Sequence, residues 1–96
     1  GGTMAVDVVQ EIKLRTDLVE LISGYVPLRP SGRSHKGLCP FHGEKTPSFH
    51  VDGERGFFKC YGCGVGGDCF TFVEKQLGLS FNEAGEFLAR RLGLEW

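Results

Sequence analysis

The chain has 96 residues, which fits one small domain and excludes a catalytic domain joined to a separate binding domain. Hydrophobic residues make up 41% of the sequence and exclude wholesale disorder, although 15 glycines raise the entropy that folding must overcome. The net charge of −1 conceals a basic centre, because residues 29–59 carry a net charge of +3 and each flank carries −2, so an anionic partner is not excluded.

Apolar residues at helical spacing predict one or two amphipathic helices over residues 6–23, with a break near Thr16. Asp7 can cap the first helix. Thr16 or Asp17 can cap a second helix, and Glu20 completes a capping box after Asp17.

Short apolar runs between prolines and glycines predict a small antiparallel sheet in residues 25–60. The first of four strands is expected at an edge, because Pro27 has no backbone N–H to donate. Residues 52–56 form the expected hairpin loop between the last two strands. The expected strands are Tyr25–Arg29, His35–Leu38, Ser48–Val51 and Phe57–Lys59.

Two helices are predicted after the glycine-rich residues 62–67. Asp68 can cap a helix that runs to about Leu77, and Ser80 with Glu83 forms a capping box for a last helix. The apolar faces of both helices are expected to cover the sheet, so the predicted fold class is α+β.

No apolar stretch approaches membrane-spanning length, and the start of the chain lacks the features of a signal peptide. We therefore expect a cytoplasmic protein with no membrane partner, in which cysteines stay reduced. Residues 1–3 precede Met4 and are interpreted as a cloning remnant, so the expected domain comprises residues 4–96.

Two pairs of cysteine and histidine residues have the spacing of a zinc ribbon. Two residues separate Cys39 from His42 and Cys60 from Cys63, and seventeen residues lie between the pairs. Each short spacing lets a tight turn present two side chains to one ion, and seventeen residues suffice for a connecting hairpin. Three sulfurs and one nitrogen suit one Zn²⁺ ion, and because they fill its tetrahedron the ion is expected to be structural.

The remaining cysteine and histidines are weaker ligand candidates. Cys69 competes by residue type, but its place at the start of a predicted helix favours a buried thiol. His35 and His50 lie in predicted strands without a paired ligand, which favours a surface or core role. A disulfide framework is the alternative to zinc, and it requires an oxidising compartment that nothing in the sequence indicates.

No catalytic residue is predicted. The sequence offers no nucleophile with an adjacent base and no clustered carboxylates for magnesium. The glycine-rich residues 64–67 lack the lysine and hydroxyl residue that follow a phosphate-binding loop.

Strand alternation places Phe57 and Lys59 on one face of the last strand, and Phe58 and Cys60 on the other. If Cys60 points toward the metal, Phe57 and Lys59 are exposed together. Single-stranded nucleic acid binds such surfaces by stacking bases on the ring while the cation meets phosphate. The alternative is that Phe57 packs under the terminal helices and the basic residues only keep the surface soluble. Basic residues that can extend the surface are Arg33, Lys36, Lys45 and Arg55.

Two segments resemble the N-terminal zinc-binding domain of bacterial DNA primases, the DnaG family. The first is the Cys-Pro-Phe-His run at residues 39–42 with its Glu-Lys-Thr-Pro-Ser-Phe extension at 44–49, and the second is residues 58–68. Residues 14–19 and 25–28 are also similar, so the resemblance covers nearly everything after residue 3. Gly43 stands where the family often has asparagine, which is a mild departure.

The resemblance implies a zinc ribbon on an antiparallel sheet flanked by helices. It implies a domain that binds the single-stranded DNA template and helps to choose where RNA primer synthesis begins in DNA replication. The full-length primase is a DNA-directed RNA polymerase, a nucleotidyltransferase, whose Mg²⁺-binding active site lies in a separate domain. This fragment is therefore expected to polymerise nothing alone.

The partners that the resemblance implies are the template, a primase RNA-polymerase domain in the same or a neighbouring molecule, and the replicative helicase through the full-length protein. Lys45 carries over with the motif as a template contact. The residues that match the family less strictly are Arg33, Lys36, Arg55, Phe57 and Lys59.

Two other functions fit the same residues. One is a zinc-stabilised protein-interaction module of a replication protein, whose aromatic and glycine-rich surface binds a partner protein. The other is a redox switch in which the thiolates release zinc on oxidation.

Overall fold

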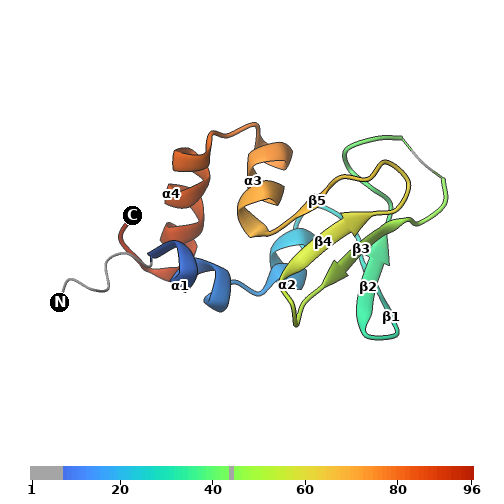
Figure 1. The fold of residues 1–96 in the computed structure, drawn as a ribbon, viewed down its shortest axis with the longest axis horizontal. Helices are drawn as coiled ribbons and strands as arrows, with labels where there is room; N and C mark the ends of the chain where they lie inside the picture. Colours follow the sequence, from blue (N-terminus) through green and yellow to red (C-terminus); the bar gives the residue numbers. More distant parts are fainter. Residues whose placement is uncertain (1–7, 44) are drawn as a thin grey trace.

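The structure is a computed structural model that describes residues 8–43 and 45–96. Helices lie at both ends of these residues and a sheet lies between them, which confirms the predicted α+β class (Figure 1). None of the helices described has the length and apolar character needed to cross a bilayer. The elements are α1 (Val8–Arg15), α2 (Leu18–Ser23), β1 (Arg29–Ser31), β2 (Ser34–Gly37), β3 (Phe49–Asp52), β4 (Phe57–Cys60), β5 (Gly66–Gly67), α3 (Cys69–Leu77) and α4 (Phe81–Leu92).

The predicted break in the N-terminal segment is confirmed between α1 and α2. Asp17 leaves helical geometry, with φ −81° and ψ 102°, and its carboxylate accepts a hydrogen bond from the backbone N–H of Glu20 at 3.1 Å. A side chain that caps the second helix in this way ends the first one. The cap predicted for Asp7 lies outside the described residues.

The five strands form an antiparallel meander in the order β1-β2-β3-β4-β5. The prediction of a first strand at residues 25–29 is wrong, because the backbone N–H groups of Tyr25 and Val26 still donate to Ile22 of α2. Pairing with β2 begins only at Arg29. The short strand β5 was not predicted, since its two glycines carry no alternating side chains to mark it.

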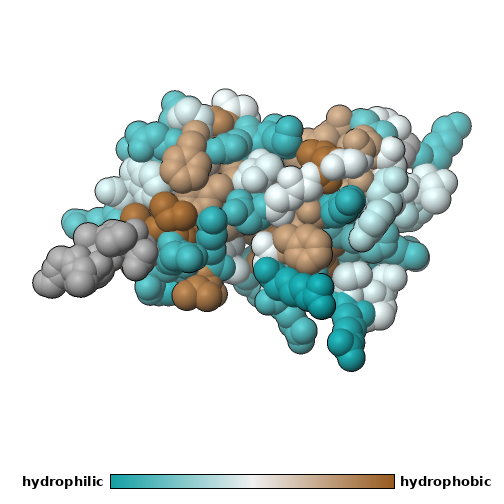
Figure 2. All heavy atoms as spheres, viewed as in Figure 1, coloured by the Kyte–Doolittle hydropathy of each residue, from teal (hydrophilic) through white to brown (hydrophobic). Residues whose placement is uncertain are grey.

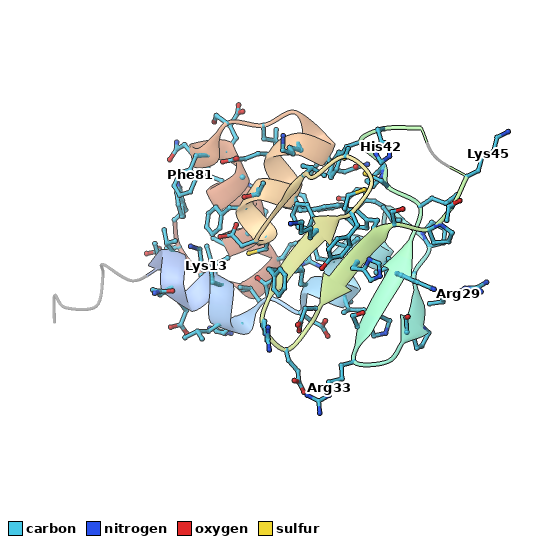
Figure 3. All side chains as sticks on the ribbon, turned by 45° about the vertical axis from the view of Figure 1, so that its right-hand side comes forward. Lys13, Arg29, Arg33, His42, Lys45 and Phe81 are labelled. Carbon is cyan, nitrogen blue, oxygen red and sulfur yellow. The ribbon has the colours of Figure 1, made fainter. Side chains whose placement is uncertain are left out.

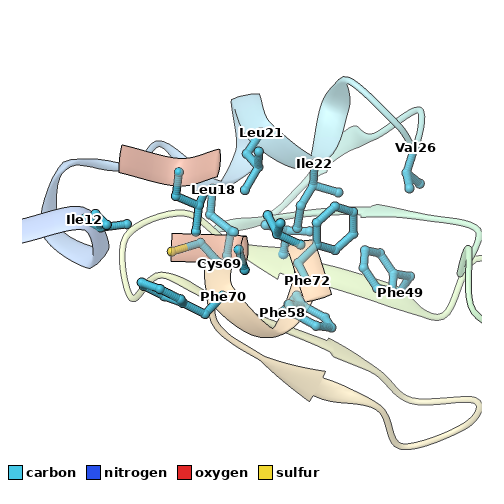
Figure 4. Close-up of a cluster of buried hydrophobic side chains, with 14 of the residues drawn as sticks. Ile12, Leu18, Leu21, Ile22, Val26, Phe49, Phe58, Cys69, Phe70 and Phe72 are labelled. Atoms are coloured by element: carbon cyan, nitrogen blue, oxygen red, sulfur yellow. The ribbon is translucent and has the colours of Figure 1, made fainter. Parts of the chain in front are cut away.

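The core lies between one face of the sheet and the helices α2 and α3 (Figure 4). Phe49, Val51 and Phe58 point inward from β3 and β4, and each is at most 1% exposed. Phe72 of α3 meets Phe58 edge to face at 5.8 Å between ring centroids. Burying an aromatic side chain stabilises a small domain by about 1.5–3 kcal/mol, so this layer holds the helices on the sheet.

Helix α4 packs mainly on α1 and α3 rather than on the sheet (Figure 1). The prediction that both C-terminal helices cover the sheet is therefore right for α3 and wrong for α4. A left-handed turn at Gly78, with φ 68°, ends α3, and α4 buries Ala84 and Leu88 in the helical part of the molecule.

Trp96 lies against the buried Gly85 of α4. Its indole N–H donates to Oδ1 of Asn82 at 2.6 Å, and its ring centroid lies 5.9 Å from that of Phe81. A Cβ atom on Gly85 would overlap the six-membered ring of Trp96. The absence of a side chain at Gly85 thus makes room for the indole.

We predict that Gly85→Ala displaces Trp96, the sole tryptophan of the chain. The lost packing costs about 1–3 kcal/mol, and the helix propensity of alanine returns about 1 kcal/mol, so a modest net destabilisation is expected. Tryptophan fluorescence should shift to the red as the ring enters water. Gly43→Ala, where an added Cβ meets open space, is the control and should leave the emission unchanged. A wild-type emission spectrum for Gly85→Ala would contradict this packing.

Asp68 caps α3 as predicted. Its Oδ1 accepts from the N–H groups of Phe70 and Thr71 at 3.0 and 3.1 Å, and its Oδ2 lies 3.2 Å from the Lys13 ammonium of α1. Burial opposes ionisation of Asp68, but the hydrogen bond from Thr71 and the charge of Lys13 outweigh it and lower the pKa of the carboxyl. The charged carboxylate therefore stabilises both the start of α3 and the contact with α1.

A lowered pKa means that this stabilisation is present above the ordinary value of 3.8 and is lost as the pH falls through the lower folded-state value. We predict that Asp68→Ala lowers the free energy of unfolding by about 0.5–2 kcal/mol at neutral pH. In acid the difference from wild type should shrink to what a neutral capping oxygen still contributes. Asp68→Asn keeps a capping oxygen without the charge, so urea unfolding should show a smaller loss at neutral pH. An equal loss for Asp68→Ala at both pH values would contradict the role of the charge.

Candidate metal centre and the open face of the sheet

Four predicted ligands come together at one end of the sheet. Cys39, His42, Cys60 and Cys63 offer ligand atoms that all lie within 4.8 Å of one another. A tetrahedral zinc site with Zn–S bonds of about 2.3 Å has edges of about 3.8 Å, so only a small contraction is needed to hold one ion. Cys69 is outside the cluster and buried, as predicted, and burial followed by the charge of Asp68 raises the pKa of its thiol to about 11.

The first pair of ligands is held by an aromatic anchor. Cys39 and His42 lie in the turn that follows β2. Between them, Phe41 turns its ring into the core, with its centroid 5.8 Å from that of Phe72, and its backbone N–H donates to Sγ of Cys39 at 3.3 Å. The turn is therefore fixed by packing and by a hydrogen bond to sulfur.

The second pair is held by the strand ladder. Cys60 is the last residue of β4, and its N–H and C=O bond to Val65 and Gly64, both at 2.8 Å. Gly64 has φ 84°, a conformation that favours glycine. The N–H of Gly62 donates to Sγ of Cys60 at 3.3 Å. Such N–H to sulfur bonds are the outer-shell contacts that orient thiolate ligands.

The thiols differ in how readily they ionise. Burial raises the pKa of the Cys39 thiol to about 11. Burial acts in the same direction on Cys60, but hydrogen bonds from the backbone of Cys63 and Gly62 outweigh it and lower the pKa of that thiol. Several thiolates held this close require a cation among them, so metal binding at this cluster would release protons.

The other face of the sheet is open and carries a row of basic side chains. Arg29 pairs with Lys36, Lys36 pairs with His50, and His50 pairs with Lys59, so the four residues follow one another across β1 to β4 on one face. With about 4.8 Å between strands, the row is about 14 Å long. Figure 3 shows the sheet in front of α2, with Arg29 at its edge.

Two exposed aromatic rings border this row. Phe57 is 38% exposed and shares the face of Lys59, which confirms the predicted alternation along β4. Tyr61 is 66% exposed, and its ring centroid lies 5.5 Å from the Lys59 ammonium and 5.1 Å from the ring of His50. The backbone N–H of Tyr61 donates to the carbonyl of Ser48 at 2.9 Å, so Tyr61 is fixed to the residue that precedes β3. We call Arg29, Lys36, His50, Lys59, Phe57 and Tyr61 the open face.

The other predicted basic residues lie at the ends of the sheet. Arg33 is in the turn between β1 and β2, and Arg55 is in the turn between β3 and β4. Arg55 lies 3.8 Å from Asp52, which shares its face with Phe57. Lys45 is exposed in the loop after the first ligand pair, and Figure 3 shows it projecting from the end of the molecule opposite Arg33.

Sequence reasoning missed three members of the open face. Tyr61 continues the alternation of Phe57 and Lys59, and that signal could have identified it. Arg29 and His50 could not be placed from spacing alone, because their neighbours are set by the pairing register of strands that are distant in sequence.

The order cysteine, histidine, cysteine, cysteine in this cluster is also the signature of a known family. The family model described as the CHC2 zinc finger of DnaG matches residues 4–96. The chain belongs to this CHC2 zinc-finger family. The family and the cluster together indicate a site for one zinc ion.

Relatives of this zinc finger are DNA primases. The chain is 47% identical over 85 residues to the DNA primase of Halalkalibacterium halodurans, which covers 88% of this chain and 14% of that protein. It is 44% identical over 95 residues to the DNA primase of Geobacillus stearothermophilus, and this match covers 99% of this chain and 16% of that protein. The chain thus spans about one sixth of the length of these relatives.

A solved structure has the same fold. The crystal structure of the zinc-binding and RNA polymerase domains of the Aquifex aeolicus primase matches with a TM-score of 0.88 and 40% sequence identity. The match covers 93% of this chain and 22% of that one. The resemblance to the zinc-binding domain of bacterial primases is therefore confirmed.

If the four clustered side chains hold the ion, the purified chain should contain one zinc per molecule by mass spectrometry under native conditions. Cys63→Ser should weaken zinc binding by more than about 100-fold, since losing only an outer-shell partner costs about 10- to 100-fold. Chelation should unfold the sheet end of the domain. Cys69→Ala is the control and should keep its metal. Full zinc content in Cys63→Ser would remove that residue from the ligand set.

Proposed function

We propose that this domain binds the single-stranded DNA template on its open face and helps to select the site at which a primase begins RNA primer synthesis. One zinc ion, held by Cys39, His42, Cys60 and Cys63, has a structural role in this proposal. The observation that carries it is the row of basic side chains across four strands, bordered by two exposed rings.

The charge of this row suits a phosphate backbone. Arg29 and Lys59 are exposed, and Lys36 and His50 are half-buried on the same face. Within the strands that the structure describes, Asp52 is the one acidic side chain in register with the face. It also accepts a hydrogen bond from the backbone N–H of Arg55 at 2.9 Å, so its charge is partnered at the hairpin. The row therefore attracts an anionic strand although the chain as a whole carries a charge of −1.

The rings suit unpaired bases. Stacking of a base on an aromatic side chain is worth about 1–3 kcal/mol and tolerates any base, whereas paired bases do not offer their faces. Tyr61 stands beside both Lys59 and His50, so one stacked base would have the Lys59 ammonium and the His50 ring next to its sugar and phosphate. This arrangement favours a single strand over a duplex.

Residues at the ends of the sheet extend the proposed contact surface. Arg33 and Arg55 lie at the hairpin end, and Lys45 lies near the ligand turns. A DNA strand that runs along the sheet, from the hairpin end to the ligand turns, would contact each of these three residues. Lys45 lies in the loop that follows His42, so its position depends on the first ligand turn.

The activity of the whole protein belongs to the same proposal. The relatives are DNA primases, and the Aquifex aeolicus structure contains an RNA polymerase domain besides the zinc-binding one. We infer that this domain presents template to such a polymerase domain, in the same or a neighbouring primase molecule. Mg²⁺ would be bound there, and the replicative helicase would be met through the full-length protein. The isolated domain would polymerise nothing.

Titration of a fluorescent single-stranded oligonucleotide tests the open face. Lys36→Ala and Lys59→Ala should each weaken binding and reduce the slope of log affinity against log salt by about 0.7, since each removes one phosphate contact. Tyr61→Ala should weaken binding by about 5- to 150-fold with little change in slope. Zinc content and circular dichroism should stay as in wild type.

Lys75→Ala is the matched control, because Lys75 is exposed in the last turn of α3, away from the sheet. It should bind as wild type does. An affinity for DNA that does not depend on salt concentration would contradict the proposal. Equal losses of affinity in Lys75→Ala and Lys59→Ala would also contradict it. If DNA binding is absent but a primase polymerase domain is captured through the open face, the surface is a protein-interaction site instead.

A further inference from the structure

A hollow lies between the helical part of the molecule and the hairpin that joins β3 to β4. Its volume is about 440 Å³, which is within the range of small-ligand pockets. Residues of α1 and of the α1–α2 junction form one wall, the hairpin and the start of β4 form the other, and the start of α3 closes the end. Figure 2 shows exposed apolar surface among hydrophilic side chains near the middle of the molecule, between these two parts.

Two exposed apolar side chains line the hollow from different walls. Leu14 of α1 is 82% exposed, an unusual degree for a leucine next to a folded core, and Phe57 of β4 is 38% exposed. A flat, apolar ligand fits between an aliphatic and an aromatic wall. Unpaired bases are held in this way in proteins that take a base out of its stack.

Cations stand at the rim. Lys13 lines the hollow from α1, and its ammonium lies 3.2 Å from the Asp68 carboxylate. Figure 3 shows Lys13 on the helical part of the molecule. Arg55 lines it from the hairpin, and its side chain is 78% exposed. Glu54 also lines the hollow, and its carboxylate suits the exocyclic amine of a base rather than a phosphate. Asp68 lines the hollow as well and is the partner of Lys13, so the rim offers Lys13 and Arg55 as donors to a phosphate and Glu54 as an acceptor for a base amine.

The hollow is continuous with the open face through Phe57. This residue follows the hairpin and lies on the same face as Lys59, two residues further along β4. Residues two apart in a β-strand are separated by about 6.6 Å. A DNA strand that crosses the row at Lys59 therefore reaches the hollow with its next nucleotide or two.

We propose that the hollow binds one unpaired base of the same DNA strand that crosses the open face, stacked on Phe57 against Leu14, with its phosphate between Lys13 and Arg55. This inference rests on the proposed function and adds to it a base-holding subsite outside the sheet. The subsite would fix the register of the strand on the domain, which a row of cations alone cannot do because phosphates repeat along the strand.

The test combines an abasic scan with a variant of the far wall. Affinity of the zinc-loaded chain is measured for a single strand of mixed sequence from which one base at a time has been removed. Removing the base that occupies the hollow should weaken binding by about 5- to 150-fold. That loss should shrink in Leu14→Ser, because the base then keeps only the Phe57 side of its site, while losses at other positions stay as in wild type. Lys13→Gln should weaken binding of intact strands by a few fold.

Leu77→Ser is the matched control, since Leu77 is an exposed leucine of α3 that does not line the hollow. It should leave the abasic profile unchanged. If wild type and Leu14→Ser lose affinity equally at every abasic position, the subsite is overturned. The proposed binding by the open face is still supported in that case if Lys59→Ala weakens binding. If Lys36→Ala and Lys59→Ala have no effect, the proposed function fails instead. Leu14-dependent binding of a free deoxynucleotide without strand binding would overturn the assignment to template.

Discussion

The four-residue cluster of Cys39, His42, Cys60 and Cys63 is the constraint on which the arrangement of the sheet depends. It joins the turn after β2 to the turn after β4, two segments that the strand β3 separates in the sheet. A domain of 96 residues buries a limited core, so a zinc ion held between these two turns would contribute stability that hydrophobic burial alone does not supply. The same tie fixes Tyr61, which lies between the two ligands of the second pair. The Cys/His cluster and the open face thus share one short turn.

One face of the sheet carries the core and the other carries the proposed binding surface. Phe49, Val51 and Phe58 point toward α2 and α3, whereas the neighbouring residues His50 and Lys59 point the other way. A change of register by one residue would bury the cations and expose the rings. The hydrophobic core therefore specifies the row of basic residues without any contact to it. Helix α4 packs mainly beside α3 and α1.

Features that depend on a few neighbouring residues could be predicted from the sequence. The caps at Asp17, Asp68 and Ser80 follow from a side-chain oxygen placed next to free backbone N–H groups, and the ligand pairs follow from their spacing.

Features that depend on contacts between distant segments could not be predicted from the sequence. The start of β1 is decided by backbone bonds from residues 25 and 26 to α2, the place of α4 is decided by packing, and the joining of Arg29 and His50 in one row is decided by register. The hollow beside Leu14 is of this second kind, because it is bounded by α1 and a hairpin about forty residues further along the chain.

The placement of the acidic residues explains how a chain of net charge −1 presents a basic surface. Asp17 and Asp68 accept hydrogen bonds at the starts of helices, and Glu83 bonds back to the N–H of Ser80 at 2.9 Å. Asp52 is engaged with Arg55 at the hairpin. Helix starts attract negative charge through their free N–H groups, so the acids that build the fold are held away from the open face. In residues 8–43 and 45–96, no acid pairs across the strands with the cations of the row, so the local field there is set by them rather than by the total charge of the chain.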